Sequence, residues 1–264
     1  ELHTNVGLHV EFSENSDSFK VHGRGEMHLS VLIETMRREG YELQVSQPQV
    51  ILKEENGKVL EPYESVVIDV PDELAGVVIE KLGTRKGEMQ NMTSDAGSTR
   101  LEYIIPTRGL LGFRMEFVTA TRGEGTLSHI FAEYGPFKGE IARRLTGSMI
   151  SGFNGKTSAY SLDNLQTRGT LFIGAPVDVY EGMVIGTSSK GTLVVNPTKG
   201  KQLTNMRSSG ADAAINLTPP LEMTLERALE YIEDDEYAEV TPKSIRIRKK
   251  FLNESDRKRN TPKN

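Results

Sequence analysis

The first part of the chain combines short stretches of period two with one longer stretch of period near 3.6 residues. The strings "GLHVEF" and "SFKVHG" alternate apolar and polar positions, which predicts two strands. "GEMHLSVLIETMRREGYEL" has apolar residues at i, i+3, i+4 and i+7 from Leu29, which predicts a helix. "YELQVSQPQVILKE" predicts a third strand, interrupted by Pro48, which has no N–H for a sheet. We expect strand, strand, helix, strand within residues 1–58.

The next segment, 59–138, predicts six elements. "YESVVIDVP" is typical of a strand, "DELAGVVIEKLGTRKG" of a helix and "GEMQNMTSDAGS" of a strand and hairpin; the strand "STRLEYIIP", the helix "RGLLGFRMEFVTATRG" and the strand "TLSHIFAEYG" come next. The order β-α-β-β-α-β is that of a ferredoxin-like sandwich. Residues 1–58 match its second half, so we expect an incomplete unit of the same kind. In the first helix, the apolar positions expected inward are Leu74, Val77, Val78 and Leu82.

From residue 139 the pattern changes to short apolar runs punctuated by glycine, such as "RGTLFIG" and "VDVYEGMVIGTSS". Such spacing predicts a mostly β domain over 139–253, with one main helix at "LEMTLERALEYIEDDE". The polar end, 254–264, is expected to be a basic flexible tail. The predicted fold class is α+β: partial and complete ferredoxin-like sandwiches before a mostly β C-terminal domain.

Composition narrows the function classes. The chain has 264 residues, of which 36% are hydrophobic and 26% charged, and it contains no apolar run of the roughly 18 residues that cross a membrane. Because cysteine is absent, disulfides and thiolate metal sites are excluded. The five histidines show no recognisable zinc spacing. The chain begins at Glu1 rather than methionine, so we expect a piece of a longer protein.

The net charge of −5 is distributed unevenly. Residues 222–239 hold eight acids and one base, 243–264 hold nine bases and two acids, and 190–211 hold four bases and no acid. An acidic protein can therefore still present local positive faces to a polyanion.

One stretch, "GFNGKTS", ends like a phosphate-binding loop at Gly155, Lys156 and Thr157. The motif requires glycine five positions before Gly155, where this chain has Ile150. The segment after Thr157 also lacks sustained helical periodicity. We therefore favour a hairpin turn at "FNGK", with a nucleotide-binding enzyme as the weakest alternative.

Longer strings carry a family resemblance. "VHGRGEMHLSVLIETMRREGYELQVSQPQVILKE" resembles the third domain of ribosome-associated translational GTPases such as elongation factor G. "EPYESVVIDVP", "GTRKGEM", "IPTRGLLGFRMEF" and above all "LTNMRSSGADAAINLTPPLEMTLERALEYIEDDEYAEVTPKSIRIRKK" resemble one branch, the TypA/BipA GTPases. The similarity runs from Leu8 to about Arg259, and its last block is specific to that branch.

The resemblance implies a longer protein whose GTP and Mg²⁺ bind in an N-terminal domain, with no cofactor, metal or catalytic residue in this chain. It implies a cytoplasmic role in translation or ribosome assembly under stress, and in virulence regulation. The implied partners are the ribosome, through ribosomal RNA and A-site tRNA near the acceptor arm, without a membrane or a small-molecule substrate.

Three sets of residues are candidates for RNA contact, because Lys and Arg bind phosphates and amides and hydroxyls supply hydrogen bonds. The first lies in the acid-free loop: Lys199, Lys201, Gln202, Thr204, Asn205, Arg207, Ser208 and Ser209. The second is a basic strand together with the tail: Arg246, Arg248, Lys249 and Lys250, then Arg257, Lys258 and Arg259. The third is the turn that carries Arg85 and Lys86, with Arg108 and Arg114 nearby.

Each set has an ordinary structural alternative. For the loop it is a solvated connection, for the basic strand it is pairing with the acidic run at 222–239, and for the turn it is plain surface charge. A protein-protein adaptor that uses an acidic helix at 222–239 is a further alternative for function.

Overall fold

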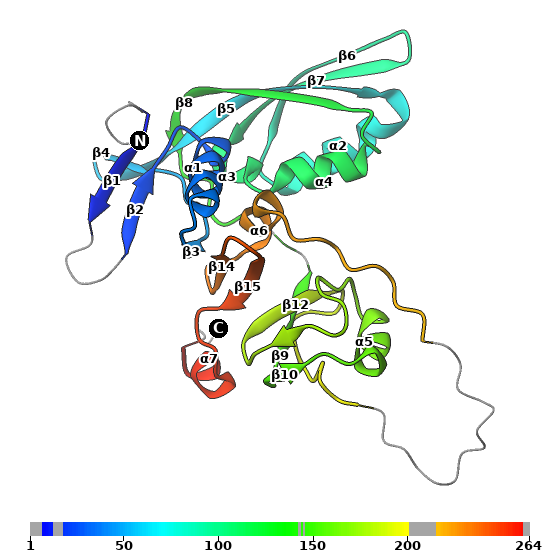
Figure 1. Cartoon of the computed structure of the whole chain (residues 1–264). Coiled ribbons are helices and arrows are strands. Elements are labelled where there is room, and N and C mark those ends of the chain that lie inside the picture. The colour runs from blue at the N-terminus through cyan, green and yellow to red at the C-terminus, as the bar shows by residue number, and fades with distance from the viewer. Residues whose placement is uncertain (1–6, 13–17, 142–143, 145, 201–214, 261–264) are drawn as a thin grey trace. The chain divides into compact units, whose positions relative to one another are not determined.

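A computed structural model describes residues 7–12, 18–141, 144, 146–200 and 215–260 (Figure 1). The chain divides into two compact units. The middle unit comprises residues 48–144, and the split unit comprises 1–47 together with 145–264. Among the described residues, no helix is both long and apolar enough to cross a membrane.

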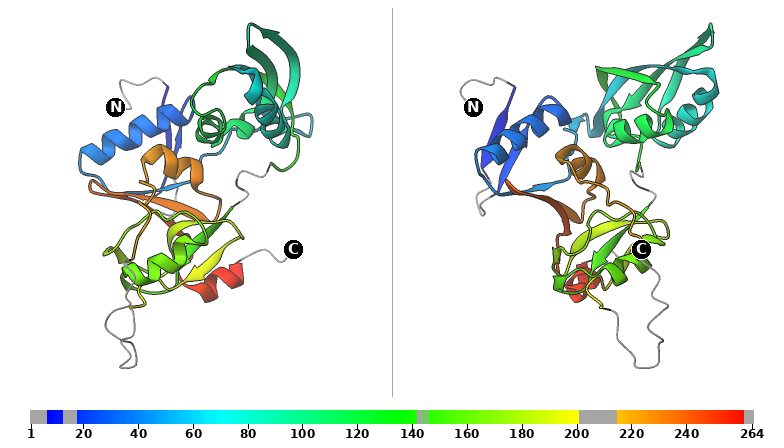
Figure 2. Two further views of the ribbon diagram at one scale, coloured as in Figure 1. Left: turned by 90° about the vertical axis from the view of Figure 1, so that its right-hand side faces the viewer. Right: turned by 45° about the vertical axis from the view of Figure 1, so that its right-hand side comes forward.

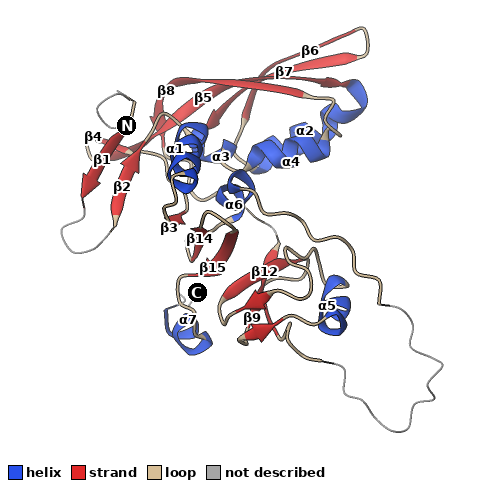
Figure 3. Cartoon of the chain, in the orientation of Figure 1, coloured by secondary structure: helices blue, strands red, loops and turns tan. Residues whose placement is uncertain are grey.

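The middle unit is an antiparallel sheet with helices α2 and α4 side by side on one face (Figure 3). Strand β5 lies between β7 and β8, and β6 pairs with the far side of β7. This is the predicted ferredoxin-like order. The elements are β4 (Lys53–Glu55), β5 (Lys58–Pro71), α2 (Asp72–Thr84), β6 (Glu88–Asp95), β7 (Ser98–Pro106), α3 (Thr107–Leu110), α4 (Phe113–Ala120) and β8 (Thr126–Pro136).

The core of the middle unit forms where alternate strand residues meet the apolar helix stripes. Ile68 of β5 is fully buried and packs in one cluster with Val78 and Leu82 of α2 and Phe113 of α4. Val77 was predicted to face inward but is 41% exposed. It lies about 100° around the helix axis from Val78, which is enough to bring its side chain to the surface.

The split unit is built on a six-stranded sheet in the order β13-β9-β12-β15-β14-β3. All neighbours are antiparallel except β13 and β9. Two short strand pairs and several helices complete its described part. The bounds are β1 (His9–Phe12), β2 (Phe19–His22), α1 (Glu26–Arg38), β3 (Leu43–Ser46), β9 (Gly147–Ser151), β10 (Gly155–Lys156), α5 (Ala159–Gln166), β11 (Asp178–Val179), β12 (Met183–Ser188), β13 (Leu193–Val195), α6 (Leu225–Tyr231), β14 (Glu236–Val240), β15 (Ile245–Lys249) and α7 (Glu254–Asn260).

Residues 1–47 and 145–264, which include parts of the domains predicted at 1–58 and 139–253, contact each other within the split unit. Strand β3 pairs with β14, and α1 and α6 contact each other beside β14 and β15 (Figure 2). Ile33 of α1 packs in one cluster with Leu229 and Ala238, and Arg37 Nε donates to Thr241 O at 2.8 Å. The apolar stripe of α1 needs a covering surface, and the C-terminal segment supplies it.

The tail, which was predicted to be basic and flexible, contains a short helix. Residues 254–260 form α7, in which Lys258 and Glu254 make an i,i+4 ion pair at 2.7 Å. Acids lie in its first turn and bases in its last turn, which complements the helix dipole. Residues 261–264 lie outside the described part.

Candidate nucleic-acid interface

The described start of the acid-free loop is attached to the N-terminal end of α5. Ser158 Oγ donates to Lys199 O at 2.6 Å, and Ser161 Oγ donates to Asn196 O at 2.5 Å. The Lys199 side chain is exposed. The backbone anchors therefore present the cation of Lys199 at the surface. Outside the described residues lie Lys201, Gln202, Thr204, Asn205, Arg207, Ser208 and Ser209, for which RNA contact stays a prediction.

The basic strand β15 is largely engaged by acids of its own unit. Lys249 is 5% exposed at its side chain, and its Nζ lies 2.8 Å from Asp235 Oδ2 and 2.9 Å from Glu236 Oε1. Arg248 Nε lies 3.6 Å from Glu239 Oε1. These contacts support the structural alternative for this set, in which the basic strand pairs with the acidic run at 222–239. They favour a structural role for Lys249 over contact with RNA.

The acidic run was predicted as one helix, but the structure divides it. Helix α6 ends at Tyr231, a turn comes next, and Glu236 begins β14. The Glu236 carboxylate is fully buried, accepts from Ser148 Oγ at 2.7 Å and accepts from Glu233 N at 3.1 Å. A carboxylate so enclosed is not available to a partner protein.

Tyr180 is also partly buried, and its hydroxyl donates to the Glu239 carboxylate at 2.5 Å. Burial raises the pKa of Tyr180 well above its usual value, and the hydrogen bond to Glu239 raises it further. Glu239 on β14 therefore has two partners, the hydroxyl of Tyr180 and the side chain of Arg248.

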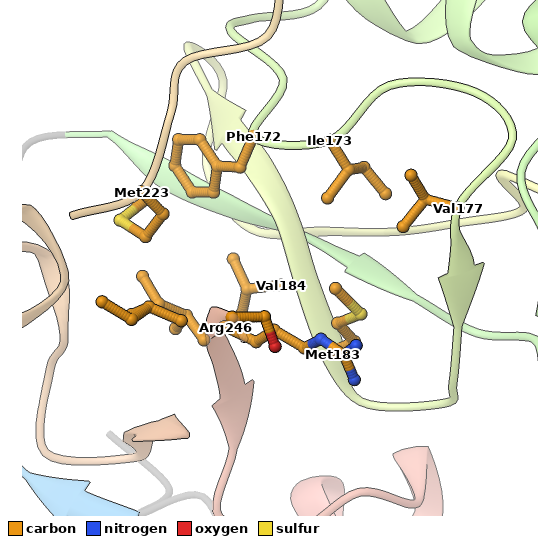
Figure 4. Close-up of a pocket in the computed structure, with 10 residues that line it drawn as sticks. Phe172, Ile173, Val177, Met183, Val184, Met223 and Arg246 are labelled. Carbon is orange, nitrogen blue, oxygen red and sulfur yellow. The ribbon is translucent and has the colours of Figure 1, made fainter. Parts of the chain in front are cut away.

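Arg246 and Lys250 flank these pairs. Arg246 is half-buried and lines an apolar cavity of about 180 Å³, among Phe172, Met183 and Met223 (Figure 4). Lys250 is also half-buried, and its Nζ lies 5.3 Å from the ring centre of Tyr237. The alternation that predicted an open basic stripe could not show what covers these side chains.

In the middle unit, the Arg85 side chain is buried and links neighbouring segments through hydrogen bonds. Its side chain is 6% exposed and donates to Gly109 O at 2.9 Å and Glu116 Oε2 at 2.9 Å. Burial alone would raise the pKa of Glu116, but Lys81 and Arg85 together hold the pKa of that carboxyl below its usual value. The prediction of Arg85 as a surface phosphate ligand does not fit this position, whereas Lys86 next to it is exposed.

Arg108 and Arg114, the other two residues of the third candidate set, differ from each other in their surroundings. The Arg108 guanidinium pairs with Glu61, whose carboxylate is fully buried, and lies 4.2 Å from the ring centre of Phe137. Arg114 is exposed on α4. Of the third candidate set, Lys86 and Arg114 are therefore the cations placed at the surface.

The "GKT" stretch forms structure of its own. Gly155 and Lys156 form β10, which pairs with β11 and not with β9, so the predicted hairpin between consecutive strands is wrong. Thr157 Oγ1 donates to Gly174 O at 2.8 Å and accepts from Val177 N at 2.9 Å. Both hydrogen bonds use the hydroxyl that a nucleotide site would need for its metal.

A helix does come after this stretch, contrary to our expectation. Ser158 caps α5 by accepting from Ser161 N at 3.1 Å, and the helix buries only Leu162 and Leu165 as apolar anchors. Two anchors in 8 residues give too little periodicity for recognition from the sequence. The first glycine of a phosphate loop is still missing, because Ile150 occupies that position and is 2% exposed within β9.

Sequence reasoning missed Arg168 as a companion of the loop. Ser189 donates from its backbone N to Arg168 O at 3.2 Å, which brings the exposed Arg168 next to the exposed Lys190. Lys199 lies at the other end of α5, a helix of 8 residues that spans about 12 Å. We call Arg168, Lys190 and Lys199 the α5 basic set. The absence of acids from 190 to 211 drew attention to Lys190 and Lys199, but that stretch does not include Arg168.

Comparison with protein families divides the chain into two matched parts. Residues 146–254 match the TypA/BipA C-terminal domain, and residues 58–145 match the elongation factor G C-terminus. The second match covers the ferredoxin-like elements, and the first covers most of the split unit with its α5 basic set.

The chain is also similar over most of its length to three curated proteins named large ribosomal subunit assembly factor BipA. It is 54% identical to the protein of Escherichia coli strain K12 and 56% identical to that of Haemophilus influenzae, each over 98% of this chain. Identity to the Synechocystis protein is 52% over 94% of the chain. The chain spans 43%, 42% and 42% of these relatives. The chain therefore contains a TypA/BipA C-terminal domain, preceded by a region that matches the elongation factor G C-terminus.

Proposed function

We propose that this chain is the part of a ribosome assembly factor that attaches the factor to ribosomal RNA of the large subunit. The observation that carries the proposal is the similarity to large ribosomal subunit assembly factors along 98% of the chain. The α5 basic set agrees with it, because exposed cations suit a phosphate backbone. The finer proposal is contact near the A site and the tRNA acceptor arm, in translation or assembly under stress.

The proposed binding works through position as well as charge. Lys199 is held by its backbone to the start of α5, and the sequence continues from it to Lys201 and Arg207. Phosphate contacts by these cations would fix the orientation of the split unit on RNA. A nucleotide-driven change elsewhere in a longer protein could then be coupled to this affinity.

We propose that GTP and Mg²⁺ bind outside this chain, in a cytoplasmic protein that is longer than it. Within the chain, Gly155, Lys156 and Thr157 are the weakest candidates for nucleotide, because the Thr157 hydroxyl serves backbone groups. The acidic run is likewise a poor adaptor surface, since Glu236 is buried and Asp235 is paired with Lys249.

A triple variant tests the loop. Changing Lys199, Lys201 and Arg207 to glutamine should weaken binding to purified large ribosomal subunits. The slope of log association constant against log salt concentration should become shallower by about 2, because each phosphate contact contributes roughly 0.7 to 0.9. The measurement is a binding titration at several salt concentrations.

The matched control removes the same charge elsewhere. Lys58, Arg122 and Lys243 are exposed bases outside the loop. Their combined change to glutamine should leave the slope close to that of the unaltered chain. Equal slopes for the loop variant and the unaltered chain would remove the loop from the interface without deciding whether the chain binds ribosomes.

A further inference from the structure

The apolar cavity of the split unit lies where strand β12 changes partners along one edge. Strand β15 pairs with this edge only at Met183 and Val184. Beyond them the segment 170–172 takes the same edge, and Phe172 N donates to Ile185 O at 2.8 Å. Strand β9 holds the opposite edge of β12. The segment 170–172 and β15 therefore diverge, and residues from both line the cavity of about 180 Å³ between them.

The walls of this cavity are mainly apolar, and Arg246 is the cation among the lining residues. Figure 4 shows Phe172, Ile173 and Val177 on one side, with the nitrogen atoms of Arg246 beside Met183 on the other. An apolar space with a single cation at its wall suits a molecule that has both an apolar body and one negative charge.

The Arg246 guanidinium is available to such a molecule. Within the described part of the chain its side chain makes no hydrogen bond or ion pair, although it is only partly exposed. Its cross-strand neighbour Glu239 lies 3.6 Å from Arg248 Nε instead and accepts from the Tyr180 hydroxyl at 2.5 Å. A partly buried cation without a partner costs free energy, which a bound anion would recover.

We propose that this cavity binds a small aromatic monocarboxylate, with the ring among the apolar side chains and the carboxylate on Arg246. A cavity of about 150 Å³ with similar walls accommodates benzene, so this cavity has room for one six-membered ring. A guanidinium can donate two parallel hydrogen bonds to a carboxylate. The flexible side chains of Met183 and Met223 adapt to the ring and make favourable sulfur contacts with it.

The size and charge of the cavity also define what it rejects. Sites for drug-sized ligands occupy roughly 300–1,000 Å³, so this cavity is too small for a nucleotide. A carboxylate without a ring leaves the apolar walls unfilled, and a ring without charge leaves Arg246 unpaired. The proposed site is separate from the α5 basic set, and binding there does not depend on contact with RNA.

The test is titration of the whole 264-residue chain with benzoate, followed through the methyl signals of its nine methionines by nuclear magnetic resonance. The signals of Met183 and Met223 should shift and saturate. Those of Met89 and Met92, which lie in the middle unit, should stay in place. Acetate and benzyl alcohol should each bind more than about tenfold more weakly than benzoate, because acetate lacks the ring and benzyl alcohol lacks the charge.

Two variants isolate the role of the guanidinium. Arg246→Met should weaken benzoate binding more than about tenfold and leave benzyl alcohol binding unchanged, which shows that the cavity is intact. Lys243→Met is the control, since Lys243 is an exposed base three residues earlier and should bind benzoate like the unaltered chain.

Three results would overturn the proposal. The first is the absence of a saturable shift at Met183 and Met223 in the unaltered chain. The second is equal benzoate affinity for Arg246→Met and the unaltered chain. The third is equal weakening of benzoate and benzyl alcohol by Arg246→Met, which would make Arg246 a part of the cavity wall and not the partner of a carboxylate.

Discussion

Glu236→Gln should lower the free energy of unfolding of the split unit by about 3 kcal/mol. The substitution leaves the Lys249 ammonium, 5% exposed, without the fully buried carboxylate 2.9 Å away. Removing one member of a buried ion pair typically costs about 3–5 kcal/mol, because the other charge stays buried. Asp235 still contacts Lys249 but is 63% exposed, which places the expectation at the lower end. Urea denaturation monitored by circular dichroism measures it.

A neighbouring acid provides the control. Asp234 is exposed, and Asp234→Asn removes the same charge with an expected change within about 0.5 kcal/mol. The double variant Glu236→Gln with Lys249→Met should recover part of the loss, since it removes the stranded cation as well. If Glu236→Gln unfolds at the same urea concentration as Asp234→Asn, the buried pair does not stabilise the sheet as described.

Gly147→Ala should destabilise the split unit by about 3 kcal/mol or prevent it from folding. A Cβ at this position would lie 1.9 Å from Gly191 C and 2.2 Å from Thr192 N, both backbone atoms. Backbone cannot rotate away as a side chain can, so β9 would have to shift within its sheet. Overpacking of this kind costs about 1–3 kcal/mol and occasionally more. Thermal and urea unfolding measure the loss.

Gly200→Ala is the matched substitution in the same unit. No heavy atom lies within 4 Å of a Cβ built there, and no positive φ applies. Its unfolding should match that of the unaltered chain within about 0.5 kcal/mol. A Gly147→Ala protein as stable as Gly200→Ala would mean that β9 and the 191–192 turn are further apart than the structure places them.

The middle unit was predictable because its information is local. Each strand and helix of 59–138 has its own periodicity, and the order β-α-β-β-α-β leaves few ways to assemble them. Val78 could be expected in the core on pattern alone. The pattern could not exclude Val77 from the core, because adjacent helix positions differ in whether their side chains face the sheet.

The split unit was not predictable in this way. Its sheet joins β3 at Leu43–Ser46 to β14 at Glu236–Val240, and no pattern in either strand identifies the other. Pairing across so many residues depends on tertiary packing, here of α1 against α6. The prediction of domains at 1–58 and 139–253 interpreted each segment alone and could not include this pairing.

The candidate interface shows the same contrast between features that could be predicted from the sequence and features that could not. Positive charge was visible in the sequence, but exposure was not. Arg85 and Lys249 have the same formal charge as Lys199, yet contacts with Glu116 and Glu236 enclose the first two. A basic residue therefore becomes a candidate for RNA contact only after its acidic neighbours are known.

Attachment of this chain itself to the large ribosomal subunit is the main property proposed for it. Co-sedimentation of the folded 264-residue chain with purified large subunits, across a series of potassium chloride concentrations, tests this property. We expect the chain to pellet with the subunits at low salt and to be released steeply as salt rises, because phosphate contacts displace counterions. A folded chain that stays in the supernatant at the lowest salt, or pellets equally at all salt concentrations, would contradict the proposal.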